Sequence, residues 1–213
     1  MTSTLPQGST IGILGGGQLG RMTAIAAARL GYQYHIFCQS PDEPAAQIAH
    51  NKTIASFEDM VALKSFAETV DLVTLEFENI PLSSFKYLES IIEVRPNSHA
   101  LSISQDRVKE KNFISDLGIE VAPFRSVKNA ADLNSMLTEL GTPSILKTAR
   151  MGYDGKGQIR IDKESQTQEA WNASGACNDT GGAILEGLIN FEREISVISA
   201  RGSNGDIVSY IPV

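Results

Sequence analysis

The chain has 213 residues, of which 42% are hydrophobic and 20% charged, as is typical of a globular protein with one large domain or two small ones. Its formal net charge of −7 argues against nucleic acid or an anionic membrane as a partner. No apolar run approaches the roughly 18 residues that cross a bilayer. We therefore expect a cytoplasmic protein in which Cys38 and Cys177 are reduced thiols.

The first half of the chain alternates apolar strands with amphipathic helices. An apolar strand at 10–14 leads into the glycine loop 15–20, then a helix that stops at Gly31 and a second strand at 34–38. This order opens a parallel, doubly wound sheet. Further elements are expected at 45–49 (helix), 52–55 (strand), 57–67 (helix), 71–77 (strand), 82–88 (helix) and 91–94 (strand), followed by a helix capped by Asn97 or Ser98.

The pattern changes near residues 102–109. Helices are expected at 108–117, 129–140 and 164–173, and strands at 123–127, 145–147, 159–161, 183–185, 194–200 and 207–210. This order of helices and strands predicts that the second half of the chain is a mixed α+β domain built on antiparallel strands. The last strand has no partner left to come, which suggests a fragment of a longer protein.

Gly15, Gly17 and Gly20 have the spacing of a dinucleotide-binding loop. That function needs an acidic residue about 20 residues on, at the tip of the second strand, to bind the ribose hydroxyls. The tip here is Cys38-Gln39-Ser40, so we disfavour NAD. The loop still exposes N–H groups at a helix N-terminus, which suits an anion such as a substrate phosphate.

A second glycine loop, Gly152–Gln158, follows a strand that ends at Lys147. Its glycines let the backbone approach a ligand, and its N–H groups can form an anion-binding concavity. Lys147 and Lys156 add positive charge, so a polyphosphate is the expected ligand. A plain hairpin with solvated lysines is the alternative. The loop is not a Walker A motif, because no Lys-Ser/Thr pair opens a helix after it.

Three further elements fit a nucleotide. Arg107 opens the second half of the chain. The segment 186–189 follows an apolar strand and has the form of a hinge whose backbone can pair with a purine edge, and Glu194, at the start of a strand, can accept hydrogen bonds from ribose hydroxyls. Each of the charged residues alone could be a solvated surface group. The ordered set favours a nucleotide site.

This order of segments resembles the ATP-grasp superfamily and, within it, the 5-(carboxyamino)imidazole ribonucleotide synthase family. The similarity covers essentially the whole chain and is carried by residues 15–22, 43–46, 76–80, 152–158 and 190–194. Tyr153-Asp154 is its specific part, since the related formate-dependent glycinamide ribonucleotide transformylases have small polar residues there.

The resemblance implies an α/β fold. It places a Rossmann-like (pre-ATP-grasp) substrate-binding domain at 1–105 and an α+β ATP-grasp domain after it. In the latter, 106–183 would be the small (lid) subdomain and 184–213 the start of a C-terminal subdomain that is truncated.

The implied reaction is the carboxylation of aminoimidazole ribonucleotide by ATP and bicarbonate in purine biosynthesis, with ADP and phosphate as products, by a homodimer. A transformylase-like ligase and an inactive nucleotide-binding fragment are the alternatives. The chemistry requires Mg2+. The family's acidic metal ligands are expected beyond Val213, so no metal ligand is assigned here.

The resemblance also implies site residues by matched position. Tyr153 and Asp154 are expected to be catalytic, orienting substrate and bicarbonate. Gln18, Leu19 and Glu76 are expected to face the aminoimidazole ribonucleotide. ATP is expected to contact Arg107, Lys147, Gly152, Tyr153, Asp154, Gly155, Lys156, Gly157, Gln158, Glu186, Gly187, Leu188, Ile189 and Glu194.

Overall fold

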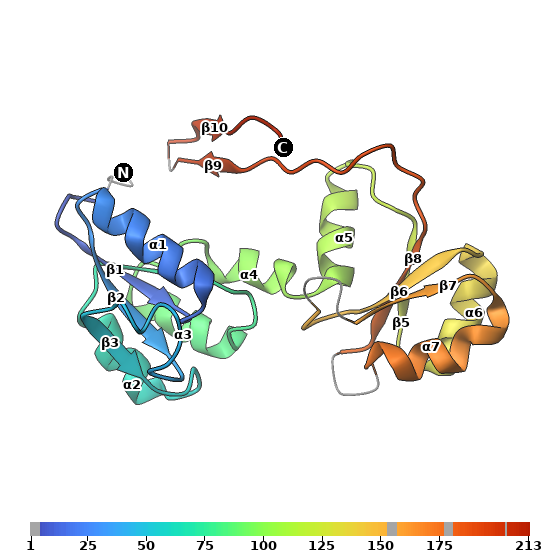
Figure 1. The fold of residues 1–213 in the computed structure, drawn as a ribbon, viewed down its shortest axis with the longest axis horizontal. Coiled ribbons are helices and arrows are strands. Elements are labelled where there is room, and N and C mark those ends of the chain that lie inside the picture. Colours follow the sequence, from blue (N-terminus) through green and yellow to red (C-terminus); the bar gives the residue numbers. More distant parts are fainter. Residues whose placement is uncertain (1–4, 153–156, 177–180, 203) are drawn as a thin grey trace.

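A computed structural model describes residues 5–152, 157–176, 181–202 and 204–213. The chain forms two lobes, each with its own sheet, joined through α4 (Ser98–Ser104) and α5 (Arg107–Asp116) (Figure 1).

The N-terminal lobe is built on a parallel sheet, as predicted. Its strand order is β3-β2-β1-β4, where β1 is Thr10–Leu14, β2 Gln33–Cys38, β3 Asn51–Ile54 and β4 Leu72–Leu75. Side chains alternate between the two faces of the sheet. Leu14 and Phe37 therefore enter one core, with α2 (Met60–Ala67) and α3 (Leu82–Ile91). Ile13 and Ile36 enter the other, with Ala24 of α1 (Gln18–Arg29).

Two expectations for this lobe were wrong. Residues 45–49 form turns rather than a helix, because tertiary bonds hold the segment: Ala45 N–H donates to the Gly16 carbonyl at 2.7 Å, and the Glu43 side chain accepts from the N–H groups of Gly16, Gln39 and Ser40. The strand expected at 91–94 is reduced to one bridge between Val73 and Val94.

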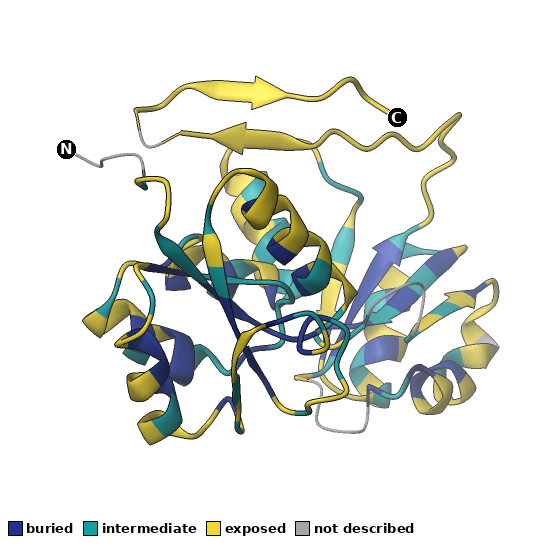
Figure 2. Ribbon diagram, turned by 60° about the vertical axis from the view of Figure 1, so that its left-hand side comes forward, coloured by how far each residue is buried: buried dark blue, intermediate teal, exposed yellow. Residues whose placement is uncertain are grey.

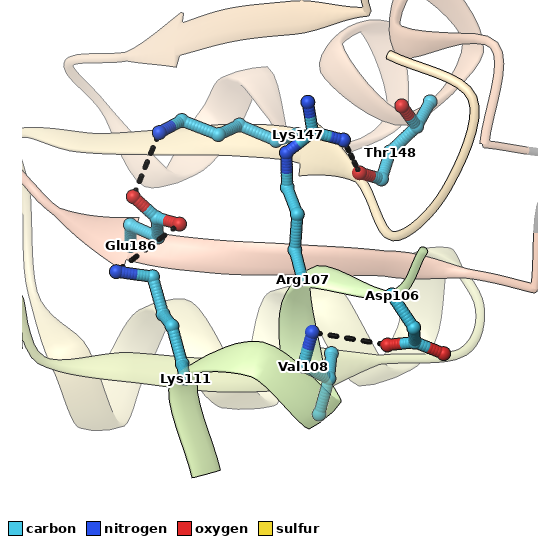
Figure 3. Close-up of polar contacts among 7 residues, drawn as sticks. All are labelled: Asp106, Arg107, Val108, Lys111, Lys147, Thr148 and Glu186. Carbon is cyan, nitrogen blue, oxygen red and sulfur yellow. Dashed lines mark hydrogen bonds and ion pairs between the residues drawn. The ribbon is translucent and has the colours of Figure 1, made fainter. Parts of the chain in front are cut away.

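The second lobe is built on an antiparallel sheet, also as predicted. Its order is β5-β8-β6-β7, where β5 is Phe124–Val127, β6 Ser144–Thr148, β7 Gln158–Ile161 and β8 Ala183–Gly187. One face packs on α6 (Ala130–Leu140) and α7 (Thr167–Ser174), which follows the short 3-10 helix Glu164–Gln166. Leu146 and Leu185 lie in that core. Their neighbours Lys147 and Glu186 therefore point to the other face, where α5 lies (Figures 1 and 3).

The last described segment lies outside both sheets. Residues 188–198 form no helix or strand, and β9 (Ser199–Arg201) and β10 (Ile207–Ser209) pair as an antiparallel hairpin (Figure 1). The strand expected at 194–200 is thus limited to β9, and Glu194 precedes it. Both strands are exposed throughout (Figure 2). None of the helices in the described ranges is long and apolar enough to cross a membrane.

Candidate functional site

A carboxylate between two lysines forms the centre of the candidate site. Glu186 accepts from Lys147 Nζ at 2.8 Å through Oε2, and Lys111 Nζ lies 3.5 Å from Oε1 (Figure 3). Glu186 is only 7% exposed, so it is not a solvated acid at a strand end. The sheet brings the groups together, because Ile145 pairs with Glu186 in register and Lys147 stands two residues further along β6, on the same face. A buried carboxylate with both oxygens paired is fixed in position.

Helix α5 supplies the cations on the opposite side of this site. Its N-cap is Asp106, whose Oδ1 accepts from the N–H groups of Val108 at 3.0 Å and Lys109 at 3.2 Å (Figure 3 draws the first). Arg107 at the first turn donates to the Thr148 carbonyl at 2.9 Å and to the Gly152 carbonyl at 2.6 Å. The guanidinium thus fixes the end of β6 and the start of the glycine loop.

The described ends of the glycine loop are closely packed. A Cβ on Gly152 would lie 2.8 Å from Thr148 Oγ1 and 3.0 Å from Arg107 Nη1, and one on Gly157 would lie 3.0 Å from the same Thr148 oxygen. Gly157 also has a φ of +71°. A Cβ on Gly152 would therefore force the Thr148 or Arg107 side chain to shift, whereas at Gly157 the left-handed backbone conformation itself favours glycine. Gln158 pairs with Lys147 in the β6–β7 ladder. The expected ligands Tyr153, Asp154, Gly155 and Lys156 lie outside the described residues.

The hinge after β8 is only partly available to a ligand. Leu188 N–H donates to the Pro143 carbonyl at 3.2 Å, and Gly187 N–H to the Pro123 carbonyl at 2.8 Å. The side chain of Ile189 is half exposed and borders a shallow hollow lined by residues 118–121. Glu194 stands on an exposed stretch without regular structure, and no hydrogen bond or ion pair places its side chain beside Glu186 among the described residues.

The first glycine loop holds the protein's own carboxylates. Glu76 accepts from Gly17 N–H at 3.0 Å and Gly20 N–H at 3.2 Å, so it caps the N-terminus of α1, while Glu43 takes Gly16 N–H. A Cβ on Gly17 would lie 2.6 Å from a Glu76 carboxylate oxygen. The expectation that these N–H groups receive a substrate phosphate is therefore wrong for Gly16, Gly17 and Gly20.

The other predicted substrate contacts lie next to this cap. Gln18 and Leu19 open α1, and both side chains are exposed. Burial raises the pKa of Glu78, which stands two residues after Glu76. The positive charge of Arg107 opposes this rise, and the negative charge of Glu110 adds to it. The Glu78 carboxyl thus couples the N-terminal lobe electrostatically to α5.

Two residues of this region were missed by the sequence prediction. Lys111 stands four residues after Arg107, and that spacing places both on one side of α5. The second is Gln105, which is buried between the lobes. Its Nε2 donates to the carbonyls of Glu78 and Ile80, and its Oε1 accepts from Arg150 Nη2 at 3.1 Å. Nothing in the sequence marks it as buried.

No metal centre is found in the part of the chain that the structure describes, where no group of three His, Cys, Asp or Glu side chains could hold an ion.

Family models match the two lobes in succession. A ribonucleotide synthetase pre-ATP-grasp domain matches residues 8–105, and an ATP-grasp domain matches residues 112–213. The two models of ATP-grasp enzymes thus match the two lobes, which have the parallel-then-antiparallel fold expected of the ATP-grasp superfamily.

The more particular resemblance is also confirmed. The chain is 48% identical over 208 residues to the N5-carboxyaminoimidazole ribonucleotide synthase of Brucella melitensis, covering 98% of this chain and 57% of that one. It is similar to the ADP complex of purK, an N5-carboxyaminoimidazole ribonucleotide synthetase, with 39% identity, a TM-score of 0.91 and coverage of 100% and 55%.

A related structure contains both ligands of interest. It is the N5-carboxyaminoimidazole synthase of Aspergillus clavatus in complex with ADP and 5-aminoimidazole ribonucleotide, with 27% identity, a TM-score of 0.84 and coverage of 97% of this chain and 53% of that one. The chain spans about half the length of these relatives.

Proposed function

We propose that this chain is part of an ATP-grasp ligase that carboxylates 5-aminoimidazole ribonucleotide with ATP and bicarbonate, giving the N-carboxy nucleotide, ADP and phosphate. The observation that carries the proposal is the Lys147–Glu186 pair, which joins β6, the strand that leads into the glycine loop, to the first residue of the 186–189 hinge. The pair brings together the strand that leads into the phosphate loop and the hinge expected to bind adenine, as a nucleotide lying across both segments requires. The choice of substrate rests on the ligands named for the Aspergillus clavatus relative, ADP and 5-aminoimidazole ribonucleotide.

The proposed chemistry begins at bicarbonate, which is a poor electrophile. One of its oxygens attacks the γ-phosphorus of ATP, and ADP leaves. The nitrogen of the aminoimidazole attacks the activated carbon, phosphate departs, and the nitrogen loses a proton. Catalysis of this kind depends mainly on positioning and charge stabilisation in a site from which water is excluded.

The residue roles are proposals of the same kind. Lys147 and Arg107 would bind phosphates, with the loop 152–158 over them and Tyr153 and Asp154 orienting substrate and bicarbonate. Glu186 and the backbone of Leu188 and Ile189 would hold adenine, Glu194 the ribose, and Gln18, Leu19 and Glu76 the second nucleotide. The lobes would divide this work as substrate-binding (1–105), lid (106–183) and the start of a C-terminal subdomain (184–213).

The setting of the reaction is also proposed. Mg2+ would neutralise charge on the ATP phosphates, held by acidic residues that are not found among the described residues of this chain. We propose a homodimer in the cytoplasm, as expected for this family.

Phosphate release from ATP by the full-length protein tests the proposal. With Mg2+ and bicarbonate, aminoimidazole ribonucleotide should stimulate release, and Lys147→Met should reduce the stimulated rate by about a hundredfold or more, as expected for loss of a charged contact to the reacting phosphates. Lys128→Met, at an exposed lysine of the same lobe, is the matched control. Stimulation by glycinamide ribonucleotide and formate instead would assign the transformylase chemistry.

A further inference from the structure

We propose that Lys111 is a positioning residue for the nucleotide site: it retains the Glu186 carboxylate when Lys147 leaves that carboxylate for a nucleotide phosphate. The inference rests on the proposed function, because it needs Lys147 to bind phosphate.

The geometry assigns one lysine to each oxygen of the carboxylate. Lys147 Nζ lies 2.8 Å from Oε2, and Lys111 Nζ lies 3.5 Å from Oε1. The cations approach Glu186 from opposite sides and from different elements, Lys147 from β6 within the sheet and Lys111 from α5 (Figure 3). All three groups are largely buried: the exposed fraction of the side chain alone is 22% for Lys147, 18% for Lys111 and 9% for Glu186.

This arrangement lets one cation move without leaving the carboxylate alone. A buried carboxylate that loses its only partner is strongly destabilised, because its desolvation is no longer compensated. With Lys147 as the sole partner, transfer of its ammonium to a phosphate would carry that cost. With Lys111 still beside Oε1, Glu186 remains paired and oriented.

Lys111 is held in place by groups that a nucleotide need not move. Its ammonium lies 5.9 Å from the ring centroid of Phe124, and Phe124 pairs with Glu186 in the β5–β8 register. The helix that carries Lys111 is fixed by its Asp106 cap and by the Arg107 bonds to the end of β6. Lys147, by contrast, stands at the end of a strand next to the phosphate loop.

The inference predicts a loss that depends on phosphate. In the full-length protein, Lys111→Met should raise the calorimetric Kd of Mg-ADP by about tenfold, a free-energy difference of about 1.4 kcal/mol. The Kd of adenosine should change by less than about twofold, since without a phosphate Lys147 stays on Glu186. A general structural defect would weaken both ligands alike.

Matched variants isolate the contact with Glu186. Lys111→Arg should restore the Mg-ADP affinity to within about threefold, and Lys109→Met, at an exposed lysine of the same helix, should leave it unchanged. In a Glu186→Gln background, Lys111→Met should raise the Kd of Mg-ADP by less than about a further twofold. A double-mutant cycle gives this result when the two residues act through a direct contact. Lys111→Gln is a second neutral variant should the methionine variant fold poorly.

Several results would overturn the inference: an unchanged Kd of Mg-ADP in Lys111→Met, an equal loss for adenosine, or an undiminished loss in the Glu186→Gln background. A different result would reject the proposed function itself. If the wild-type protein binds no Mg-ADP, the nucleotide site itself is wrong, whereas binding by the wild type with a neutral Lys111→Met rejects only the role of Lys111.

Discussion

Carboxylates fixed by backbone or lysine partners organise this chain at the scale of single residues. Glu76 caps α1 across the lobe, and Glu186 pairs with lysines of β6 and α5. The sequence marks both positions, because each follows an apolar strand. The sequence does not indicate their partners, because a carboxylate bound to backbone N–H groups and one that binds a ligand occur in the same sequence pattern.

A buried histidine gives the N-terminal lobe a predicted pH dependence. His35 Nδ1 lies 2.9 Å from Thr69 Oγ1 and Nε2 lies 2.9 Å from Thr53 Oγ1. Thr69 O–H donates to the Phe66 carbonyl, so Nδ1 carries the hydrogen and Nε2 accepts from Thr53. Burial lowers the pKa of His35 from its ordinary value of 6.5.

The sign of the effect follows from that shift. As the pH falls below 6.5, the unfolded chain binds the proton before the folded one, so the stability present at higher pH is progressively lost. The urea midpoint should therefore drop between pH 7.5 and pH 5.5, and His35→Gln should reduce the drop. His50→Gln, at an exposed histidine, should leave it as in the wild type. Equal drops in the wild type and His35→Gln would refute the assignment.

At the scale of elements, α5 carries the largest share of the candidate site. It bears Arg107 and Lys111 one turn apart, and its start is fixed by the Asp106 cap. No residue of α5 is buried, so apolar packing contributes little to its position. The Asp106 cap and the Arg107 hydrogen bonds hold it in place instead. The sequence predicted the helix from residue 108 but placed neither Lys111 nor the cap in the site.

Removing the cap should therefore affect both stability and binding. Asp106→Ala should cost about 1 kcal/mol of unfolding free energy and weaken Mg-ADP binding, because Arg107 and Lys111 shift with the helix end. Asp59→Ala is the control, since Asp59 caps α2 through the same two N–H contacts and lies in the other lobe. It should cost about as much stability and leave the Kd unchanged. Equal effects of the two variants on the Kd would contradict this role of α5.

Most other elements follow from local patterns. The apolar strands β1, β2, β6 and β8 and the capped helices were predicted within a few residues. The errors at 45–49 and 194–200 arise where distant partners decide the backbone. Glu43 binds N–H groups of the first glycine loop, and Ser196 exchanges two backbone hydrogen bonds with Val213, outside both four-stranded sheets.

At the scale of the whole molecule, Gln105 links the lobes. Its side-chain N–H group donates to the carbonyls of Glu78 and Ile80 in the N-terminal lobe, and its side-chain oxygen accepts from Arg150 of the second lobe. The sequence predicted two domains and the change of pattern near this position. It could not predict the contact between them, because a buried glutamine and an exposed one look alike in a polar stretch.

Truncating this side chain should weaken the junction. Gln105→Ala leaves two carbonyls and a largely buried guanidinium short of partners, which should cost about 2 kcal/mol or more in urea unfolding. Gln39→Ala, at an exposed glutamine, should cost less than about 0.5 kcal/mol. Closely similar midpoints for the two variants would show that the junction contributes little to stability.

A structure of the full-length protein with Mg-ADP tests the central claim most directly. We predict adenine against the 187–189 backbone, Lys147 Nζ at a phosphate oxygen, and Glu186 still paired with Lys111. ADP bound at Gly15–Gly20, or anywhere remote from β6 and β8, would contradict the account.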